Sequence, residues 1–127
     1  MNWLIKSGEK TPLDINKGSV AWGNYFDAEF EYYTNTSKTT ATKNFKSQTR
    51  IASGAYEGAK ANNIYDLAGN VMLWTLENYG LGSGYNRCYR GASCNQDGVS
   101  IHASFRDYNG PTFGSDIVGF CGTLYIK

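Results

Sequence analysis

The chain has 127 residues, and its 12 Lys and Arg against 11 Asp and Glu give a formal net charge of +1. This length suits one domain with a modest hydrophobic core. The near-neutral charge gives no electrostatic drive towards nucleic acid or an anionic membrane surface. No apolar run reaches the roughly 18 residues of a membrane span, and no signal-peptide pattern opens the chain.

The glycine and cysteine content narrows the class of protein further. Fifteen glycines and ten tyrosines with only two prolines favour a loop-rich domain that contains strands over a helical one. Cys88, Cys94 and Cys121 have no metal-ligand spacing and cannot all pair with one another. We therefore expect no disulfide framework, and free thiols suit a reducing site of synthesis such as the cytoplasm.

The first elements are predicted to be a helix end, an exposed strand, and a solvated hairpin or loop. Met1 to Gly8 suits the last turns of a helix, since Lys6 favours a helix C-terminus and Gly8 can occupy the C′ position. Alternation over residues 27–33 predicts an exposed strand. Residues 34–50 are rich in Thr, Ser and Lys, so we interpret them as a solvated hairpin or loop rather than a basic binding patch.

The stretch from Asn62 to Glu77 is predicted to organise the core. Gly69 and Asn70 both tolerate positive φ, so a sharp turn is expected there. The apolar run over residues 71–76 then predicts a buried strand, with Trp74 as the largest side chain of the core.

Three further elements are expected towards the C-terminus. Residues 79–85 are glycine-rich and predict a flexible loop. Residues 87–93 are expected to form another core strand, and residues 123–126 a final strand. Between them, Val99 to Arg106 alternates apolar and polar side chains, which is typical of an amphipathic strand followed by a Gly, Asn and Ser loop.

A compositional bias gives the region after Ser93 a second interpretation. Met, Trp, Lys, Glu and Gln make up 18 of the 93 residues before Cys94 but one of the 27 from Cys94 to Phe120, namely Gln96. These are the five side chains that an Asn codon cannot reach when only its adenines change. The bias is what mutation of adenines in an Asn-rich template would leave, with Gln96 as a fixed position.

Several short motifs also resemble one known family. They are residues 63–75 (NIYDLAGNVMLWT), Trp22-Gly23-Asn24, Arg90-Gly91-Ala92-Ser93, Ala103-Ser104-Phe105-Arg106, Pro111 and Gly119-Phe120-Cys121. In this order and spacing they resemble the formylglycine-generating (sulfatase-modifying) family over roughly residues 20–127. The resemblance implies a single α+β domain of C-type-lectin-like fold over residues 1–127. It also implies that the family's N-terminal portion is absent here, so the chain is expected to be a shortened form or part of a larger protein.

The resemblance does not extend to the catalytic chemistry of the family. Its oxidases hold copper with two cysteines, three and eight residues after the serine that corresponds to Ser93. Those positions are Gln96 and Ile101 here, and neither provides a thiolate. The calcium-binding motif of the family has Trp and Glu where this chain has Met72 and Leu73, so a carboxylate ligand is missing. We expect no enzyme activity, no cofactor and no metal.

The predicted function is ligand binding through a diversified surface. Within the family, the chain resembles the variable proteins of diversity-generating retroelements of phages and bacteria, with a variable region at about residues 94–118, here termed the tail segment. The predicted binding residues are Cys94, Asp97, Val99, Ile101, His102, Phe105, Asp107, Tyr108, Phe113, Ser115 and Asp116. Scaffold residues would be Tyr65, Trp74, Arg90, Gly91, Ala103, Arg106, Gly119 and Phe120.

The predicted surface is expected to contain three aromatic side chains, and one alternative function stays open. Phe105, Tyr108 and Phe113 among small polar residues are typical of a recognition surface, although alternation places Phe105 with Ala103. The partner would be a protein or surface ligand, bound from a virion or cell surface, and the oligomeric state stays open. The alternative is an oxidase of the formylglycine-generating class or its inactive relative.

Overall fold

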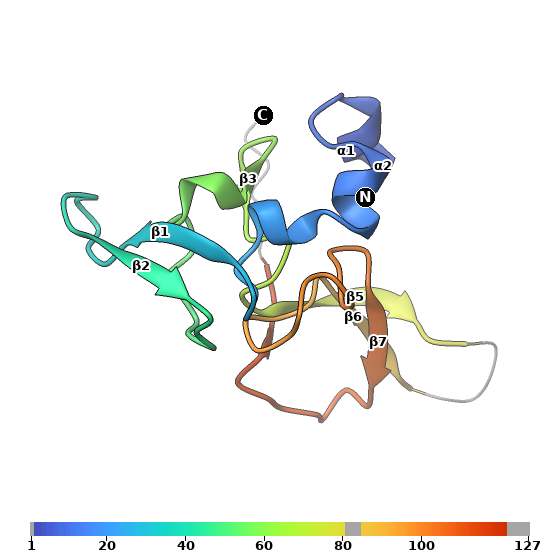
Figure 1. The fold of residues 1–127 in the computed structure, drawn as a ribbon. Helices are drawn as coiled ribbons and strands as arrows, with labels where there is room; N and C mark the ends of the chain where they lie inside the picture. The colour runs from blue at the N-terminus through green and yellow to red at the C-terminus, as the bar shows by residue number, and fades with distance from the viewer. Residues whose placement is uncertain (1, 81–84, 122–127) are drawn as a thin grey trace, which may run out of the picture.

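The fold consists of few, short helices and several short strands joined by long loops. A computed structural model describes residues 2–80 and 85–121 (Figure 1). Its elements are α1 (Asn2–Lys6), α2 (Pro12–Asn16), η1 (Ser19–Trp22), β1 (Glu29–Tyr33), β2 (Ala41–Phe45), η2 (Glu57–Ala59), β3 (Lys60–Ala61), β4 (Ile64–Tyr65), β5 (Met72–Asn78), β6 (Arg87–Arg90), β7 (Arg106–Asn109) and β8 (Val118–Gly119). The predicted loop-rich α+β class is thus confirmed.

A four-stranded sheet with the order β7-β6-β5-β8 carries the C-terminal half of the described chain. β5, β6 and β7 are antiparallel neighbours, whereas β8 lies parallel to β5 at the edge. Leu73 at the start of β5 pairs with Arg90 on one side and Gly119 on the other. The predicted strand over residues 87–93 is confirmed only as far as Arg90, where β6 ends.

The first half of the chain follows the local signals closely. Gly8 follows α1 with φ +77°, as expected for the residue after a helix C-terminus. Thr11 and Asp14 then form a reciprocal capping box at the start of α2, with 2.8 Å between Thr11 N and Asp14 Oδ2. β1 and β2 form the predicted hairpin, which projects to one side of the four-stranded sheet (Figure 1).

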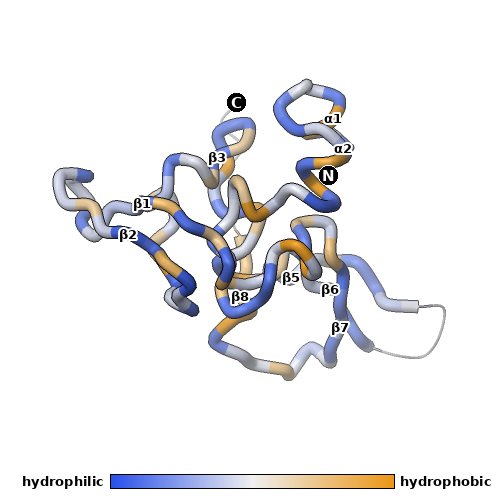
Figure 2. The backbone as a smooth tube through the Cα atoms, in the orientation of Figure 1, coloured by the Kyte–Doolittle hydropathy of each residue, from blue (hydrophilic) through white to orange (hydrophobic). Residues whose placement is uncertain are grey.

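The hydrophobic core is assembled from small contributions of many elements. Its buried members are Leu4, Ile15, Trp22, Tyr25, Ala28, Ala61, Ala68, Ala92 and Ala103. Five of these nine are alanines, and hydrophobic residues occur in separate short stretches along the backbone (Figure 2). The core therefore depends on close approach between backbones more than on large interlocking side chains.

The prediction of Trp74 as the largest core side chain is wrong. Trp22 is buried and donates its indole N–H to Asp14 O at 3.1 Å, whereas Trp74 is only half-buried on the sheet. The run over residues 71–76 is not buried throughout either, because Leu76 is 98% exposed. β5 has only one face against the core, so an apolar run along it need not be buried.

The predicted turn at Gly69 and Asn70 is confirmed, and both residues have positive φ, +68° and +63°. The backbone of the turn lies against Asn24, since Asn70 N donates to Asn24 O at 2.7 Å. A β-carbon on Gly69 would lie 2.3 Å from that same oxygen. Glycine is therefore required for contact as well as for conformation.

The amphipathic strand predicted over residues 99–106 is absent from the structure. Turns occupy most of this stretch, and the strand β7 begins only at Arg106. Hydrogen bonds within the segment replace the ladder of a sheet: Ile101 N donates to Asp97 O and Phe105 N to His102 O, both at 2.8 Å. Val99 is 65% exposed whereas Ile101 packs against the core, so the apolar positions of the pattern do not share one face.

Two predicted segments fall wholly or partly beyond the described residues. The final strand at residues 123–126 lies outside them, as does the middle of the glycine-rich loop over residues 79–85. Among residues 2–80 and 85–121, no helix has both the length and the apolar character to cross a membrane.

Candidate ligand-binding surface

The tail segment begins at a buried anchor. Cys94 is 1% exposed; its N–H donates to Asn70 O at 3.0 Å and its thiol to Gln48 O at 3.4 Å. Burial raises the pKa of the Cys94 thiol. The prediction that Cys94 belongs to the binding face is therefore wrong, because a side chain this enclosed cannot contact a ligand.

The turn that follows is held by side chains that accept from the backbone. Gln96 Oε1 accepts from Ser93 N at 2.9 Å, which gives this position a structural role. Asp97 is exposed, but its Oδ1 accepts from Val99 N at 2.8 Å, and this bond lowers the pKa of the carboxyl. Val99 is among the most exposed hydrophobic side chains of the tail segment.

The middle of the tail segment packs partly against the core. Ile101 and Phe105 are half-buried, and Ile101 contacts the core cluster. His102 is also half-buried, and its Nδ1 lies 2.8 Å from Ser104 Oγ, which also donates to Asn16 Oδ1. These three predicted binding residues have only part of their surface available to a partner.

β7 presents its side chains to two opposite faces of the sheet. Asp107 pairs with Tyr89 and Tyr108 with Cys88, and successive strand residues point to opposite sides. Asp107 and Tyr108 therefore lie on different faces, although both were predicted as parts of one surface.

One face carries a row of aromatic rings. Phe113 stacks on Tyr89 with 6.4 Å between ring centroids, and Tyr89 meets Trp74 edge-on at 5.3 Å. Asp107 joins this row because its Oδ2 accepts from the Tyr89 hydroxyl at 3.0 Å. Phe113 is 38% exposed at the outer end, so the row offers a ring edge to solvent.

The opposite face carries a cluster of stacked tyrosines and paired charges. The Tyr79 and Tyr108 rings stack with centroids 3.5 Å apart, and the Arg106 guanidinium lies 4.9 Å from the Tyr79 centroid. Glu77 accepts from Arg90 Nη2 at 2.8 Å and lies 3.0 Å from Arg106 Nε. The hydrogen bond from Arg90 lowers the pKa of the Glu77 carboxyl.

The three aromatic residues predicted to form one recognition surface are thus separated. Phe113 belongs to the face with Tyr89, Tyr108 belongs to the face with Tyr79, and Phe105 lies partly buried between turns. The sequence prediction missed two aromatic residues that flank them, Tyr89 on β6 and Tyr79, which directly follows β5. Alternation along β5 and β6 was the available signal for these positions.

The end of the tail segment returns to the scaffold. Arg50 Nη1 donates to Asp116 O at 2.9 Å and pairs with its carboxylate, which lowers the pKa of Asp116. Ser115 is half-buried. Phe120, which was predicted to hold the scaffold, is 87% exposed, so that part of the prediction is wrong.

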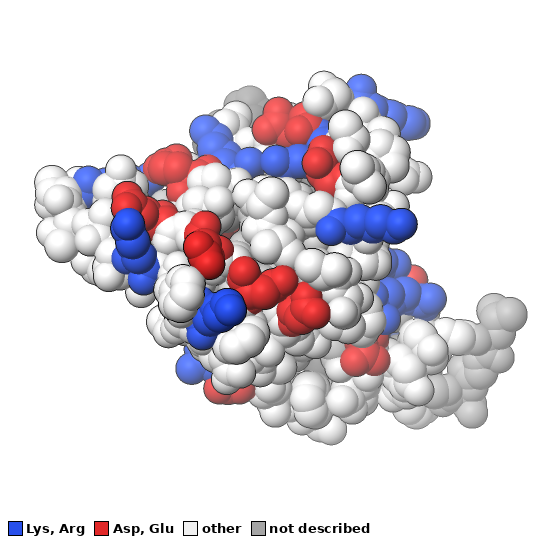
Figure 3. Space-filling view, viewed as in Figure 1, with Lys and Arg blue, Asp and Glu red and all other residues white. Residues whose placement is uncertain are grey.

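Positive and negative side chains are interspersed on the face seen in Figure 3.

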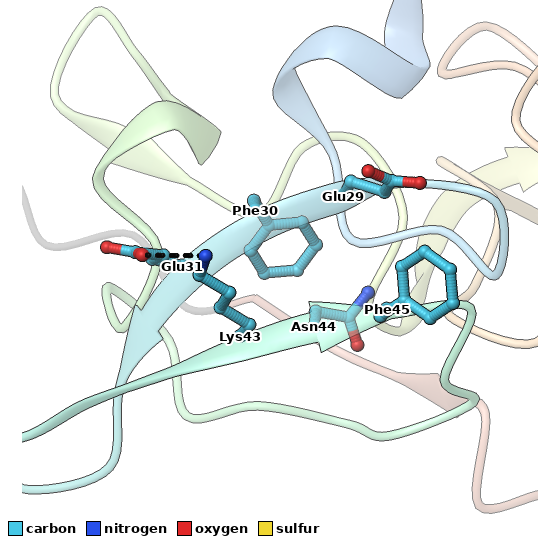
Figure 4. A pocket seen from close by; sticks show the side chains of 6 residues that line it. All are labelled: Glu29, Phe30, Glu31, Lys43, Asn44 and Phe45. Carbon is cyan, nitrogen blue, oxygen red and sulfur yellow. Dashed lines mark ion pairs between the residues drawn. The ribbon is translucent and has the colours of Figure 1, made fainter.

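An open hollow lies away from the tail segment, on the β1–β2 hairpin. It measures about 270 Å³ and is lined by Glu29, Phe30, Glu31, Lys43, Asn44 and Phe45 (Figure 4). Its rim carries both positive and negative side chains, and Lys43 Nζ lies 3.9 Å from Glu31 Oε1. The sequence predicts no site on this hairpin.

The positions that hold metals in the resembled family carry other side chains in this chain. Gln96 is engaged with Ser93, and Ile101 packs against the core. Within the part of the chain that the structure describes, no three His, Cys, Asp or Glu side chains are grouped so that they could hold an ion. The donor set present does not fit the copper or calcium of the resembled family.

The comparison with protein families gives one match. The model of the sulfatase-modifying factor enzyme 1-like domain (FGE-sulfatase) matches residues 7–121, which is most of the chain. Neither a curated protein nor a solved structure matches the chain.

Proposed function

We propose that this chain, which belongs to the family of sulfatase-modifying factor enzyme 1-like domains, is a non-catalytic ligand-binding protein with a diversified tail segment. The scaffold would be C-type-lectin-like, and diversity would come from a retroelement that mutates template adenines. Exposed side chains of residues 97–116 would contact a protein or surface ligand of a phage or bacterium. Family membership alone does not decide the activity, because sites are grafted onto folds.

The observation that carries this proposal is the way the tail segment is attached. Three bonds between backbone atoms attach its main chain to the scaffold: Cys94 N to Asn70 O, Phe26 N to Gln96 O, and Met72 N to Ile117 O. Such bonds survive substitution, because every residue except proline provides the same donor and acceptor. The attachment of the tail segment at these three points can therefore persist while its exposed side chains change.

The buried positions within the tail segment also suit this role. They are occupied by the small residues Cys94, Gly98 and Ala103. A β-carbon at Gly98 would lie 2.7 Å from both Tyr25 Cγ and Val20 Cγ2, so this position must stay fixed. The larger side chains of Val99, Tyr108 and Phe113 are 65%, 40% and 38% exposed. Aromatic residues among Ser, Gly, Asn and Asp resemble the composition of antibody paratopes.

The oxidase alternative receives no support from the same residues. Copper oxidation of a substrate cysteine requires two thiolates, and positions 96 and 101 carry a carboxamide and an alkyl chain. Cys94 is the nearest thiol in sequence, and its raised pKa disfavours the thiolate form. We therefore assign Gln96 a structural role at the base of the tail segment.

Sequencing the DNA that flanks the gene tests this proposed function. We expect a near copy of the tail codons, rich in Asn codons, beside a reverse-transcriptase gene. The two copies should differ almost only where the template has adenine. Absence of both the copy and the reverse transcriptase would overturn diversification, and differences spread evenly over all four bases would also contradict it.

A further inference from the structure

We propose that Arg106, together with the ring faces of Tyr79 and Tyr108, forms a subsite for a carboxylate group of the bound protein. This inference rests on the proposed function, because it names the chemistry that one part of the binding surface recognises. The three side chains lie on one face of the sheet, and all are partly exposed. Their chemistry differs from that of the Phe113 row on the other face.

The hydrogen bonds of Arg106 leave one edge of its guanidinium available to a ligand. Its Nε donates to Cys88 Sγ at 3.2 Å and lies 3.0 Å from Glu77 Oε1. Its Nη1 and Nη2 make no hydrogen bond within residues 2–80 and 85–121. Arg90 differs, because its Nε, Nη1 and Nη2 all donate to Glu77 or Ser104. Arg106 is thus held in place by one edge and offers the other edge, whose geometry matches a carboxylate.

The cluster of Arg90, Arg106 and Glu77 carries more positive than negative charge. Arg90 and Arg106 share the single carboxylate of Glu77, so one positive charge stays unbalanced on this face. Asp107 does not neutralise it, since that side chain belongs to the opposite face and accepts from Tyr89. One unbalanced charge matches a carboxylate monoanion better than a phosphate dianion.

The tyrosine pair supplies the contact area beside the charge. Tyr79 and Tyr108 stack at 3.5 Å and are each about two-fifths exposed. Aromatic faces next to a guanidinium favour the apolar stem of an acidic side chain or a planar acid. Tyr108 is a predicted variable position and Arg106 a predicted scaffold position. A constant carboxylate contact would then have a changeable neighbour that tunes which acidic ligand fits.

Benzoate is a suitable probe, because it combines one carboxylate with one ring. We expect saturable binding to the intact chain with a dissociation constant on the order of millimolar. Titration followed by NMR should move the Arg106 side-chain resonances and the ring signals of Tyr79 and Tyr108. Benzyl alcohol should move them far less at equal concentration. Tighter binding of phenyl phosphate than of benzoate would overturn the assignment to a carboxylate.

Matched variants separate this subsite from general electrostatics. Arg106→Gln should weaken benzoate binding at least about tenfold, whereas Arg87→Gln removes the same charge from the other face and should leave binding unchanged. Equal losses in both variants, or none in Arg106→Gln, would overturn the proposal. If Arg106→Gln does not fold, Arg106→Lys keeps the charge without the fork and should still weaken binding. Benzoate binding can fail while the flanking DNA supports diversification, so the two proposals fail separately.

Discussion

Replacement of Asn70 by alanine is expected to lower the free energy of unfolding by about 4 kcal/mol, since it leaves buried groups without partners. The Asn70 side chain accepts from Ile51 N at 3.0 Å and from Asn24 Nδ2 at 3.1 Å, and it donates to Ile51 O at 3.0 Å. Asn70 is buried, so water cannot replace these bonds in the folded state. Chemical denaturation measures the loss directly.

Asn63→Ala is the matched control for Asn70→Ala. Both positions have φ +63°, so both substitutions place alanine in the same unfavourable backbone conformation. Asn63 is exposed, and its side chain has no hydrogen bond within the described residues. The control should therefore lose only about 1 kcal/mol. Similar losses in the two variants would show that the buried amide does not hold the turn.

Replacement of Gly69 by alanine is expected to cost at least about 3 kcal/mol, because backbone atoms block the new methyl group. The β-carbon would lie 2.3 Å from Asn24 O and 2.7 Å from Asn24 C. The positive φ adds backbone strain to this clash. Gly69 and Asn24 also form an isolated bridge that joins the central turn to the first half of the chain.

Gly8→Ala isolates the strain from the clash. Gly8 has φ +77°, and a β-carbon there meets no heavy atom within 4 Å. Its loss should be about 1 kcal/mol, the cost of the left-handed conformation alone. Thermal and chemical denaturation of both variants give the comparison. A loss in Gly69→Ala no larger than in Gly8→Ala would mean that Asn24 moves aside freely.

Features set by neighbours in sequence were predicted correctly. The helix end at Gly8, the exposed strand within residues 27–33 and the turn at Gly69 and Asn70 all follow from local conformational preference. The α+β class followed from composition and from the resemblance to the family. These signals require no knowledge of which elements pack together.

Features that depend on packing were predicted less well. Leu76 lies in an apolar run yet is exposed, because the sheet buries only part of β5. Cys94 lies in a polar stretch yet is buried, with its N–H bonded to Asn70 O and its thiol to Gln48 O. The strand predicted from alternation in the tail segment is likewise wrong. Hydrogen bonds accepted by Asp97 and His102 stabilise turns there instead.

The predicted recognition surface is divided between two faces of the sheet, which also depends on how the strands pair. Tyr108 and Phe113 are close in sequence but lie on different faces, because Tyr108 belongs to β7 and Phe113 follows it in a loop that returns to Tyr89. Only the register of β7 against β6 reveals this division. The carboxylate subsite proposed above lies on the face of Tyr108.

The central claim is that a fixed scaffold tolerates changes in the exposed part of the tail segment. The most direct measurement is the unfolding free energy of a triple variant, Val99→Asn, Tyr108→Asn and Phe113→Asn. We predict a loss within about 2 kcal/mol, most of it from the two lost ring stacks. The buried pair Cys94→Asn and Ala103→Asn is the control and should lose more than about 5 kcal/mol. A triple variant as unstable as this control would contradict the claim and make the tail segment ordinary core.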